Sequence, residues 1–501
     1  MKKNNFWNRW DWLGLSIVFI VAVLIKLPHN SQGFFAFAYD QGRDLLAVAR
    51  IIYEGHFTLI GPTTGLQGIF YGPWWYYFLS PLLYLSGGDP QKVSIFFAVL
   101  GIFTTLGIYF FIKYSTKSIP IAFGLSLIAA MSSTWMLGPT LIWSPSLVPP
   151  LMIIYFYILQ KIFLNSRPIY YFLFGITAFL ISEAGAAFGL MVVMFLFLTP
   201  LIFQKSFFKK EFLLTLLGGS LIVFPRFLFD LRHNFLISKS VFSYIKQANI
   251  YGEHLTYFQR FIQRSDLFLG FFSWSIVKGN KIIAIFIIVL IVVFLFYLYK
   301  NRKLFTKLAN DKLLIYLLLF VSFLFLAFTI FKDRIWDHYL VGLPLIFVVI
   351  ISRIMSFASQ FKNAKIPLYT IIIFLVIFNF NTQLFSPFKI NWLGGDADYI
   401  NQKKVMDYIS SKHLENYSVF KYSPAIFDYP FDYLFYWYER RGLLEIPKDN
   451  QRLIYLVIRE ESSKKYYKSG WYGDKTKDKT VVLERKKFPG DLVVEKHLKN
   501  D

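Results

Sequence analysis

Two aspartates four residues apart, Asp40 and Asp44, follow the first apolar segment of the 501-residue chain. Apolar residues continue at helical spacing from Leu45 to Ile52, which predicts that both aspartates share one face of an amphipathic helix, with Arg43 beside them. A carboxylate in this position can deprotonate an incoming hydroxyl group. The structural alternative is a helix N-cap formed by Asp40, with Asp44 in the first turn. Residue types alone favour this alternative.

Basic residues collect at two other places where apolar segments end or begin, together with histidine and aspartate. The first cluster comprises Arg226, Asp230, Arg232 and His233. The second comprises Arg334, Asp337, His338 and Tyr339. Arginine and histidine held at a membrane face can bind a phosphate through charge-assisted hydrogen bonds, and the aspartates would orient them. Arginine side chains that reach toward lipid headgroups explain the pattern equally well.

Three further features have a functional and a structural interpretation. Glu183 is the one acid well inside an apolar stretch, so it is either a functional carboxylate or a water-facing residue near a helix hinge. Tyr71 lies in an aromatic run, 69–77, whose rings could stack on a sugar, although an interfacial aromatic belt is favoured. The Ser and Pro residues of the segment 140–146 are typical of a turn, and this structural interpretation is favoured.

The composition places these residues in a membrane. Hydrophobic residues make up 56% of the chain and charged residues 17%, which argues against a soluble globular protein. Eleven apolar segments can cross about 30 Å of hydrocarbon. They cover residues 12–28, 92–112, 120–137, 147–160, 169–183, 186–203, 212–229, 280–299, 313–331, 339–357 and 367–385. The first has no cleavage site and is predicted to be a retained anchor.

The net charge of +23 would suggest nucleic acid in a soluble chain, but here it follows the membrane topology. Alternate connections between the segments carry 17 Lys and Arg against three acids, which predicts a cytoplasmic N-terminus. The connections 29–91, 138–146, 230–279 and 332–338 and the region after 385 then lie outside. A twelfth span at 70–86 would place Lys113 and Lys117 on the outer side of the membrane. This segment is therefore predicted to be an interfacial helix.

Absent motifs narrow the chemistry further. The chain contains no cysteine, which excludes disulfides, thiol catalysis and cysteine-ligated metals. It also lacks a Walker-type phosphate loop, an H-E-x-x-H motif and a G-x-S-x-G motif. An ATP-driven pump and a membrane protease are therefore not favoured.

The region 391–501 is predicted to be a separate α+β domain on the outer face, following a membrane domain of residues 1–390. Its short apolar runs have strand length. The predicted elements are helices near 397–413 and 430–441 and strands near 417–422, 452–459, 479–485 and 491–496. Its aromatic residues Tyr429, Tyr433, Trp437 and Trp471 either bind an acceptor or cap the bundle, and the structural role is favoured.

Taken together, these features resemble the GT-C superfamily of integral membrane glycosyltransferases, in the bacterial branch related to protein O-mannosyltransferases and the aminoarabinose transferase of lipid A. The features are Asp40 after the first span, the aromatic and proline segment 70–81, the run 230–235, and His338-Tyr339 before Pro344. Relatives often carry Asp-Glu where this chain has Asp40 and Gln41, and a Pro-Pro-Leu motif where it has the aromatic segment.

The resemblance implies an α-helical polytopic fold with outer juxtamembrane helices, and transfer of a sugar from a polyprenyl-phosphate carrier to an acceptor with inversion. Asp40 would be the general base. The phosphate would be bound by Arg226, Arg232, His233, Arg334 and His338. Asp44, Arg43, Tyr71, Glu183 and Tyr339 would line the substrate cavity. No nucleotide is needed, no nucleic acid is expected as a partner, and a divalent metal is possible, although Gln41 weakens that expectation.

Two other activities stay open at this stage. A transporter or flippase of lipid-linked sugars predicts broken helices with ionisable groups near the bilayer midplane, whereas the groups here concentrate at one face. A glycan polymerase or ligase of the same fold would differ only in its acceptor.

Overall fold

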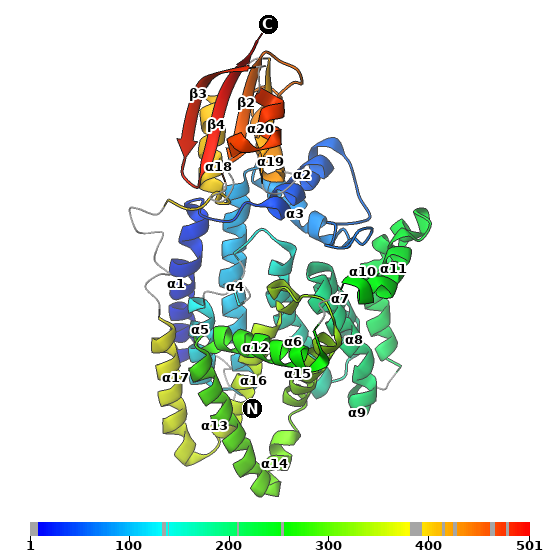
Figure 1. The fold of residues 1–501 in the computed structure, drawn as a ribbon. Helices are drawn as coiled ribbons and strands as arrows, with labels where there is room; N and C mark the ends of the chain where they lie inside the picture. The colour runs from blue at the N-terminus through cyan, green and yellow to red at the C-terminus, as the bar shows by residue number, and fades with distance from the viewer. Residues whose placement is uncertain are drawn as a thin grey trace.

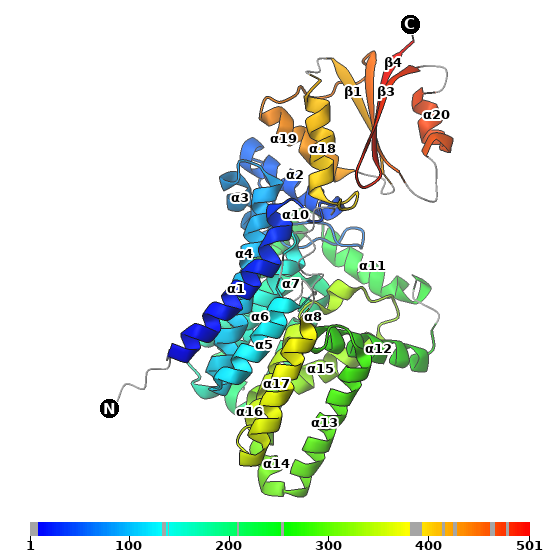
Figure 2. The same ribbon diagram turned by 90° about the vertical axis from the view of Figure 1, so that its left-hand side faces the viewer.

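The structure is a computed structural model that describes residues 9–132, 137–138, 140–207, 210–251, 255–380, 393–412, 416–423, 428–460, 466–476 and 480–500. A tall helical bundle carries a small sheet-containing domain at one end (Figures 1 and 2). We call this end of the bundle the domain end. The opposite end, where helices α9 (Gln204–Phe207) and α14 (Arg302–Ala309) lie, is the basal end.

All eleven predicted apolar segments form helices. In the described ranges, eight helical segments are long and apolar enough to cross a membrane, and α5, α7 and α8 are shorter apolar helices. The eleven helices are α1 (Arg9–Ser31), α4 (Pro90–Thr116), α5 (Ile119–Met131), α6 (Val148–Leu164), α7 (Pro168–Ala184), α8 (Ala186–Ile202), α10 (Phe212–Arg232), α13 (Lys281–Lys300), α15 (Lys312–Ile330), α16 (Leu343–Ala358) and α17 (Lys365–Asn379). The predicted ends at 137 and 385 lie beyond α5 and α17, and residues 133–136 and 381–385 fall outside the described ranges.

Small residues let helices of the bundle pack closely. A Cβ atom on Gly175 of α7 would lie 1.9 Å from the carbonyl oxygen of Thr215 in α10, and one on Gly218 would lie 2.3 Å from the carbonyl oxygen of Phe172. Because lipid tails are as apolar as leucine, close van der Waals packing of this kind is what holds membrane helices together.

Four helices lie in the segments predicted as outer connections. They are α2 (Tyr39–Glu54), α3 (Trp74–Leu85), α11 (Leu236–Tyr251) and α12 (Tyr257–Ile276). With 12 residues, α3 is too short to cross a membrane, in agreement with the prediction for 70–86. Its tryptophans make protein contacts: Trp74 Nε1 donates to the Ile222 carbonyl at 2.6 Å, so a lipid belt is not their only role.

The C-terminal domain contains a four-stranded sheet of order β1-β2-β4-β3. Its strands are β1 (Tyr417–Tyr422), β2 (Leu453–Arg459), β3 (Thr480–Phe488) and β4 (Leu492–Lys499), and its predicted helices are α18 (Tyr399–Ser410) and α19 (Tyr429–Arg440). The β1 and β2 strands are parallel and the other pairs are antiparallel. The predicted α+β character is confirmed, although helix α20 (Gly470–Thr476) was not predicted. The predicted boundary at 390/391 lies outside the described residues.

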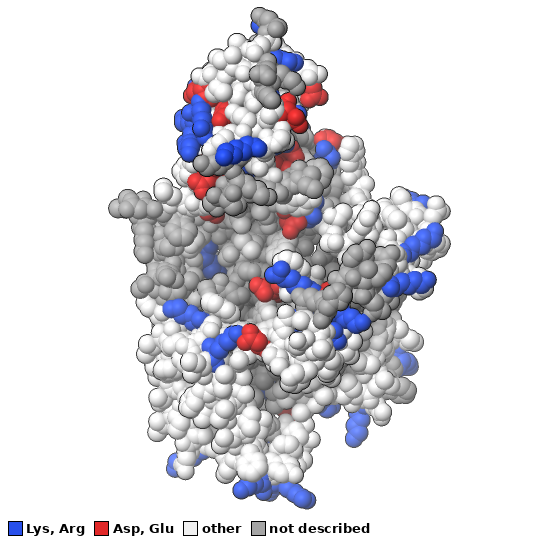
Figure 3. All heavy atoms as spheres, viewed as in Figure 1, with Lys and Arg blue, Asp and Glu red and all other residues white. Residues whose placement is uncertain are grey.

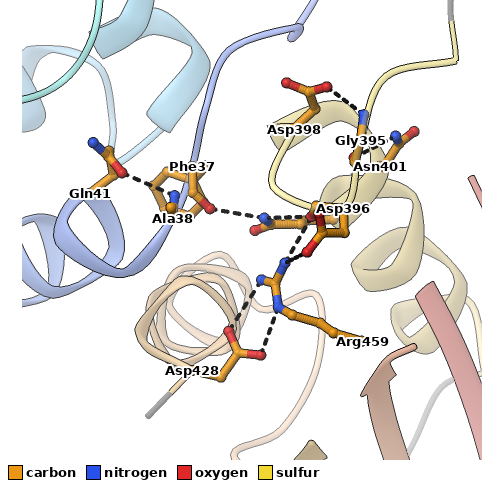
Figure 4. Close-up of polar contacts among 10 residues, drawn as sticks. Phe37, Ala38, Gln41, Gly395, Asp396, Asp398, Asn401, Asp428 and Arg459 are labelled. Atoms are coloured by element: carbon orange, nitrogen blue, oxygen red, sulfur yellow. Dashed lines mark hydrogen bonds and ion pairs between the residues drawn. The ribbon is translucent and has the colours of Figure 1, made fainter. Parts of the chain in front are cut away.

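Polar contacts fix this domain to the segment that leads into α2 (Figure 4). Within the domain, Arg459 is buried between the carboxylate of Asp428, at 3.1 Å, and the backbone carbonyl of Asp396, at 2.8 Å, which fixes the loop before α18. Gln402 Nε2 donates to the Phe37 carbonyl at 2.9 Å. A Cβ on Gly42 of α2 would lie only 2.3 Å from the backbone nitrogen of Pro430 in α19. The helix that carries Asp40 is therefore packed directly against the C-terminal domain.

The aromatic residues of α19 serve this contact. The Trp437 indole donates to the Gly87 carbonyl at 3.0 Å, and the Tyr433 hydroxyl donates to the Gly88 carbonyl at 2.5 Å. Both side chains are buried. Trp471 lies elsewhere, tilted against Tyr422 with ring centroids 5.2 Å apart.

Candidate active site

Asp40 lies in the first turn of α2 and is not its cap. The residue before the helix is Ala38, whose backbone N–H donates to the Gln41 side chain at 3.0 Å. The N-cap interpretation of Asp40 is therefore wrong, because the helix begins at Tyr39 and Asp40 lies within its first turn. The Asp40 side chain is 39% exposed and remains accessible to a substrate.

Arg43 lies between the two aspartates. Its guanidinium is 3.1 Å from Asp40 and 2.8 Å from Asp44. Asp44 is buried and also accepts a hydrogen bond from Trp75 Nε1 at 2.7 Å. Because both Arg43 and α3 contact it directly, Asp44 holds α2 and α3 together, whereas Asp40 keeps an open side.

Burial raises the pKa of Asp44 from 3.8 to about 6, against the opposing effect of Arg43. Since the folded state favours the protonated form, the contribution of this group to the free energy of unfolding is present below pH 3.8 and is lost as pH rises through about 6. We expect the wild type to lose thermal stability relative to Asp44→Asn across this window. Unfolding temperatures of both proteins at several pH values measure this, and a constant difference would contradict it.

Two other titratable side chains, His338 and Tyr71, lie within electrostatic range of Asp40. His338 is half-buried, lies within electrostatic range of Asp40 and Asp337, and packs edge-on against Trp143 with ring centroids 5.2 Å apart. Burial raises the pKa of Tyr71 to about 12, and its hydroxyl interacts with Tyr339, Asp40 and Arg43. The Tyr71 hydroxyl is thus a neutral group, hydrogen-bonded to the backbone of Ala186.

Glu183 and Arg226 form a second polar centre. The Arg226 guanidinium is 3.1 Å from one Glu183 oxygen, and the backbone N–H of Gly72 donates to the other. Glu183 is buried. The carboxylate therefore joins α7 and α10 to the residue that follows Tyr71.

Tyr71 and Gly72 end a short hairpin that leads into α3. Thr63 and Phe70 pair as an antiparallel bridge, and the Gly61 N–H donates to the Tyr71 carbonyl at 2.8 Å. A Cβ on Gly72 would lie 2.2 Å from a Glu183 carboxylate oxygen. Only glycine allows this approach, so the hairpin and Glu183 fix the position of Tyr71 together.

The remaining predicted residues are not brought together in the same way. Asp230 was expected to orient cations, but its carboxylate accepts hydrogen bonds from the backbone N–H of Ile237 and the hydroxyl of Ser238, each at 2.6 Å. It caps the start of α11, whose first N–H groups need an acceptor. Arg232 and His233 are exposed at the end of α10, and His233 stacks on the ring of Phe229.

Arg334 is also exposed and lies over the ring of Trp336 at 4.2 Å. Two buried arginines nearby were not predicted. Arg260 Nε and Arg264 Nε, one turn apart on α12, donate to the carbonyls of Thr329 and Phe328 at the end of α15. They satisfy carbonyl groups that a helix end leaves free, and Arg264 also donates to the Asp333 carbonyl at 3.0 Å. They support the connection that carries Arg334 and His338.

Trp143 and Gly72 were also missed as site residues. Trp143 was assigned to turn chemistry, and only its contact with His338 gives it another role. The possible metal was left open; among the described residues, no group of three His, Asp or Glu side chains is arranged to hold an ion.

Solved structures similar to this chain include ArnT from Cupriavidus metallidurans bound to undecaprenyl phosphate. That structure has a TM-score of 0.57 and 11% identity, over 97% of this chain and 98% of its own. Its apo state gives 0.54 and 11%, over 97% of each chain. The chain shares the fold of these structures. The expected fold class, an α-helical polytopic membrane protein with a small α+β domain, is thereby confirmed. No protein-family model and no curated protein matches the sequence.

Within this fold, Asp40 and the residues linked to it directly or through His338 come from four separate parts of the chain. Arg43 and Asp44 belong to α2, Tyr71 to the hairpin, Trp143 to the turn before α6, and His338 to the turn before α16. Helix α2 itself is packed against α19 at Gly42 and is hydrogen-bonded to α3 through Asp44 and Trp75.

Proposed function

We propose that the chain is a membrane glycosyltransferase that transfers a sugar from a polyprenyl-phosphate donor to an acceptor hydroxyl at the domain end of the bundle. The observation that carries the proposal is an accessible carboxylate, Asp40, that pairs with Arg43 and lies within electrostatic range of His338 and Tyr71 in a fold shared with ArnT. The likeness to ArnT with undecaprenyl phosphate supports the choice of donor.

In the proposed reaction, the oxygen of the acceptor hydroxyl attacks the anomeric carbon from the face opposite the phosphate. Asp40 accepts the proton of this hydroxyl during the attack. The bond from that carbon to the phosphate oxygen breaks, and the lipid phosphate leaves with the electron pair, which inverts the anomeric centre. Negative charge grows on the leaving phosphate, so a nearby cation stabilises the transition state more than the donor.

The residues proposed for this phosphate differ in their surroundings. His338 lies within electrostatic range of Asp40, and Arg226 is held by Glu183. Arg232, His233 and Arg334 are exposed and can approach a bound headgroup. Arg43 plays a different part, because its contacts with Asp40 and Asp44 orient the base.

The proposed orientation puts the N-terminus and the basal end on the cytoplasmic side of a bacterial-type plasma membrane. The C-terminal domain then lies outside. The excess of Lys and Arg in the connections at the basal end supports this. The carrier lipid would then present its sugar at the face where Asp40 is accessible.

A reconstituted assay tests the reaction class. Vesicles with the purified protein receive polyprenyl-phosphate sugar labelled in the sugar and a mixture of acceptor extracts. We expect labelled product and free polyprenyl phosphate in equal amounts, with the opposite anomeric configuration in the product. Labelled lipid that crosses the bilayer without cleavage would contradict the proposal and indicate a flippase.

A further inference from the structure

An apolar groove runs between α13 and the helices α15 and α16. Its volume is about 620 Å³, within the range of ligand-binding pockets. Its walls include Ile291 and Leu295 of α13, Val321 of α15 and Ile350 of α16. Among the residues that line it, Ser265 is the polar one.

Helix α13 stands apart from the bundle. Figures 1 and 2 show it running from α12 to α14 at the margin of the molecule. Of its 20 residues, only Ala284 and Leu298 are buried. An apolar gap in a bilayer loses dispersion contacts if it stays empty, and lipid acyl chains are the apolar material available to fill it.

The two ends of the groove differ in chemistry. Phe268 and Phe272 of α12 close the end nearer the candidate active site. At the basal end, Phe305 and Leu308 of α14 line the groove. The same short helix carries Arg302, Lys303 and Lys307, and Lys300 precedes it. Figure 3 shows a mostly uncharged lower surface with Lys and Arg at its lowest tip.

These four cations are available to a ligand. None of them forms an ion pair with another residue in the described ranges, although Lys307 Nζ donates to Gln360 Oε1 at 2.7 Å. Basic residues beside a cleft between membrane helices bind anionic headgroups, and an amphipathic helix with a basic face lies in the headgroup region.

We propose that this groove binds an anionic phospholipid from the leaflet at the basal end, with its acyl chains between α13 and α15 and its phosphate at Arg302 and Lys303. The charge pattern favours this lipid over the tail of a polyprenyl donor. Under the proposed function a donor would have its phosphate near Asp40, toward the domain end, whereas the cations of α14 lie at the basal end. The choice between these two lipids therefore rests on the proposed function.

Photo-crosslinking tests this site. The full-length protein is placed in phosphatidylcholine nanodiscs with a trace of phosphatidylglycerol that carries a photoreactive acyl chain, and labelled peptides are mapped. We expect labels on α13 and α15, and competition by unlabelled phosphatidylglycerol but not by phosphatidylcholine. Removal of both charges by Arg302→Gln and Lys303→Gln should reduce labelling by about 25-fold, since each cation near a membrane surface contributes about fivefold in affinity.

Two controls separate the site from general surface charge. Lys278→Gln with Lys281→Gln removes two cations near the opposite end of α13 and should leave labelling unchanged. Val292→Trp fills the groove and should abolish labelling while the basal cations remain. Equal labelling of the wild type and of the Arg302→Gln, Lys303→Gln variant would overturn the proposal. So would displacement of the probe by polyprenyl phosphate, which would assign the groove to the donor tail.

Discussion

Replacing Asp40 by Asn is expected to reduce kcat for sugar transfer by about 10²–10⁴-fold, because a positioned general base contributes this much. The amide keeps the size of the side chain and can still contact its surroundings, but it cannot accept a proton. Asp40 is 39% exposed and its ion pair with Arg43 has a length of 3.1 Å at the protein surface, so the fold should tolerate the change. Donor KM should change little.

The matched control is Glu54→Gln at the other end of α2. Its carboxylate accepts a hydrogen bond from Tyr436 at 3.2 Å and is far along the helix from Asp40. We expect near wild-type turnover. Initial rates with labelled donor, measured on both proteins at equal folded fraction, give the comparison, and full activity of Asp40→Asn would eliminate it as the base.

Gly72→Ala is expected to have the second largest effect. The new Cβ would lie 2.2 Å from the Glu183 carboxylate, which also pairs with Arg226. Overpacking of this kind costs about 1–3 kcal/mol of unfolding free energy. It also moves Tyr71 relative to Asp40, and a displacement near 1 Å can reduce turnover on the order of a hundredfold.

Gly65→Ala in the same hairpin is the matched control, because no atom lies within 4 Å of its Cβ position. Thermal unfolding and the kinetic constants of the two variants are compared. Equal behaviour of Gly72→Ala and Gly65→Ala would show that the contact with Glu183 does not position the hairpin.

The bundle could be predicted from sequence because its determinants are local. A segment of apolar residues that must satisfy its own backbone in lipid forms a helix wherever it occurs. Helix α12 is not predictable in this way, because Arg260, Arg264 and Asp266 interrupt its apolar pattern. Their partners lie on other elements, at the end of α15 and at Lys281, which the sequence order does not reveal.

The candidate site was predictable only in part. Residue type and helical spacing were enough to identify Asp40 and to place Arg43 and Asp44 next to it. The predicted role of Asp230 failed because a carboxylate near a helix start is satisfied by the nearest backbone N–H groups. Gly72 and Trp143 gain their roles from contacts with Glu183 and His338, which are more than a hundred residues away in the chain.

The close approach of Gly42 to Pro430 also sets an order of events during synthesis. Helix α2 emerges early, but the surface that packs against it belongs to α19, which is made almost four hundred residues later. Contacts between such distant parts of a chain form slowly and leave apolar surface uncovered until then. Helix α2 therefore lacks its packing partner until α19 has been made, and a product terminated before α19 should be a substrate for membrane quality control.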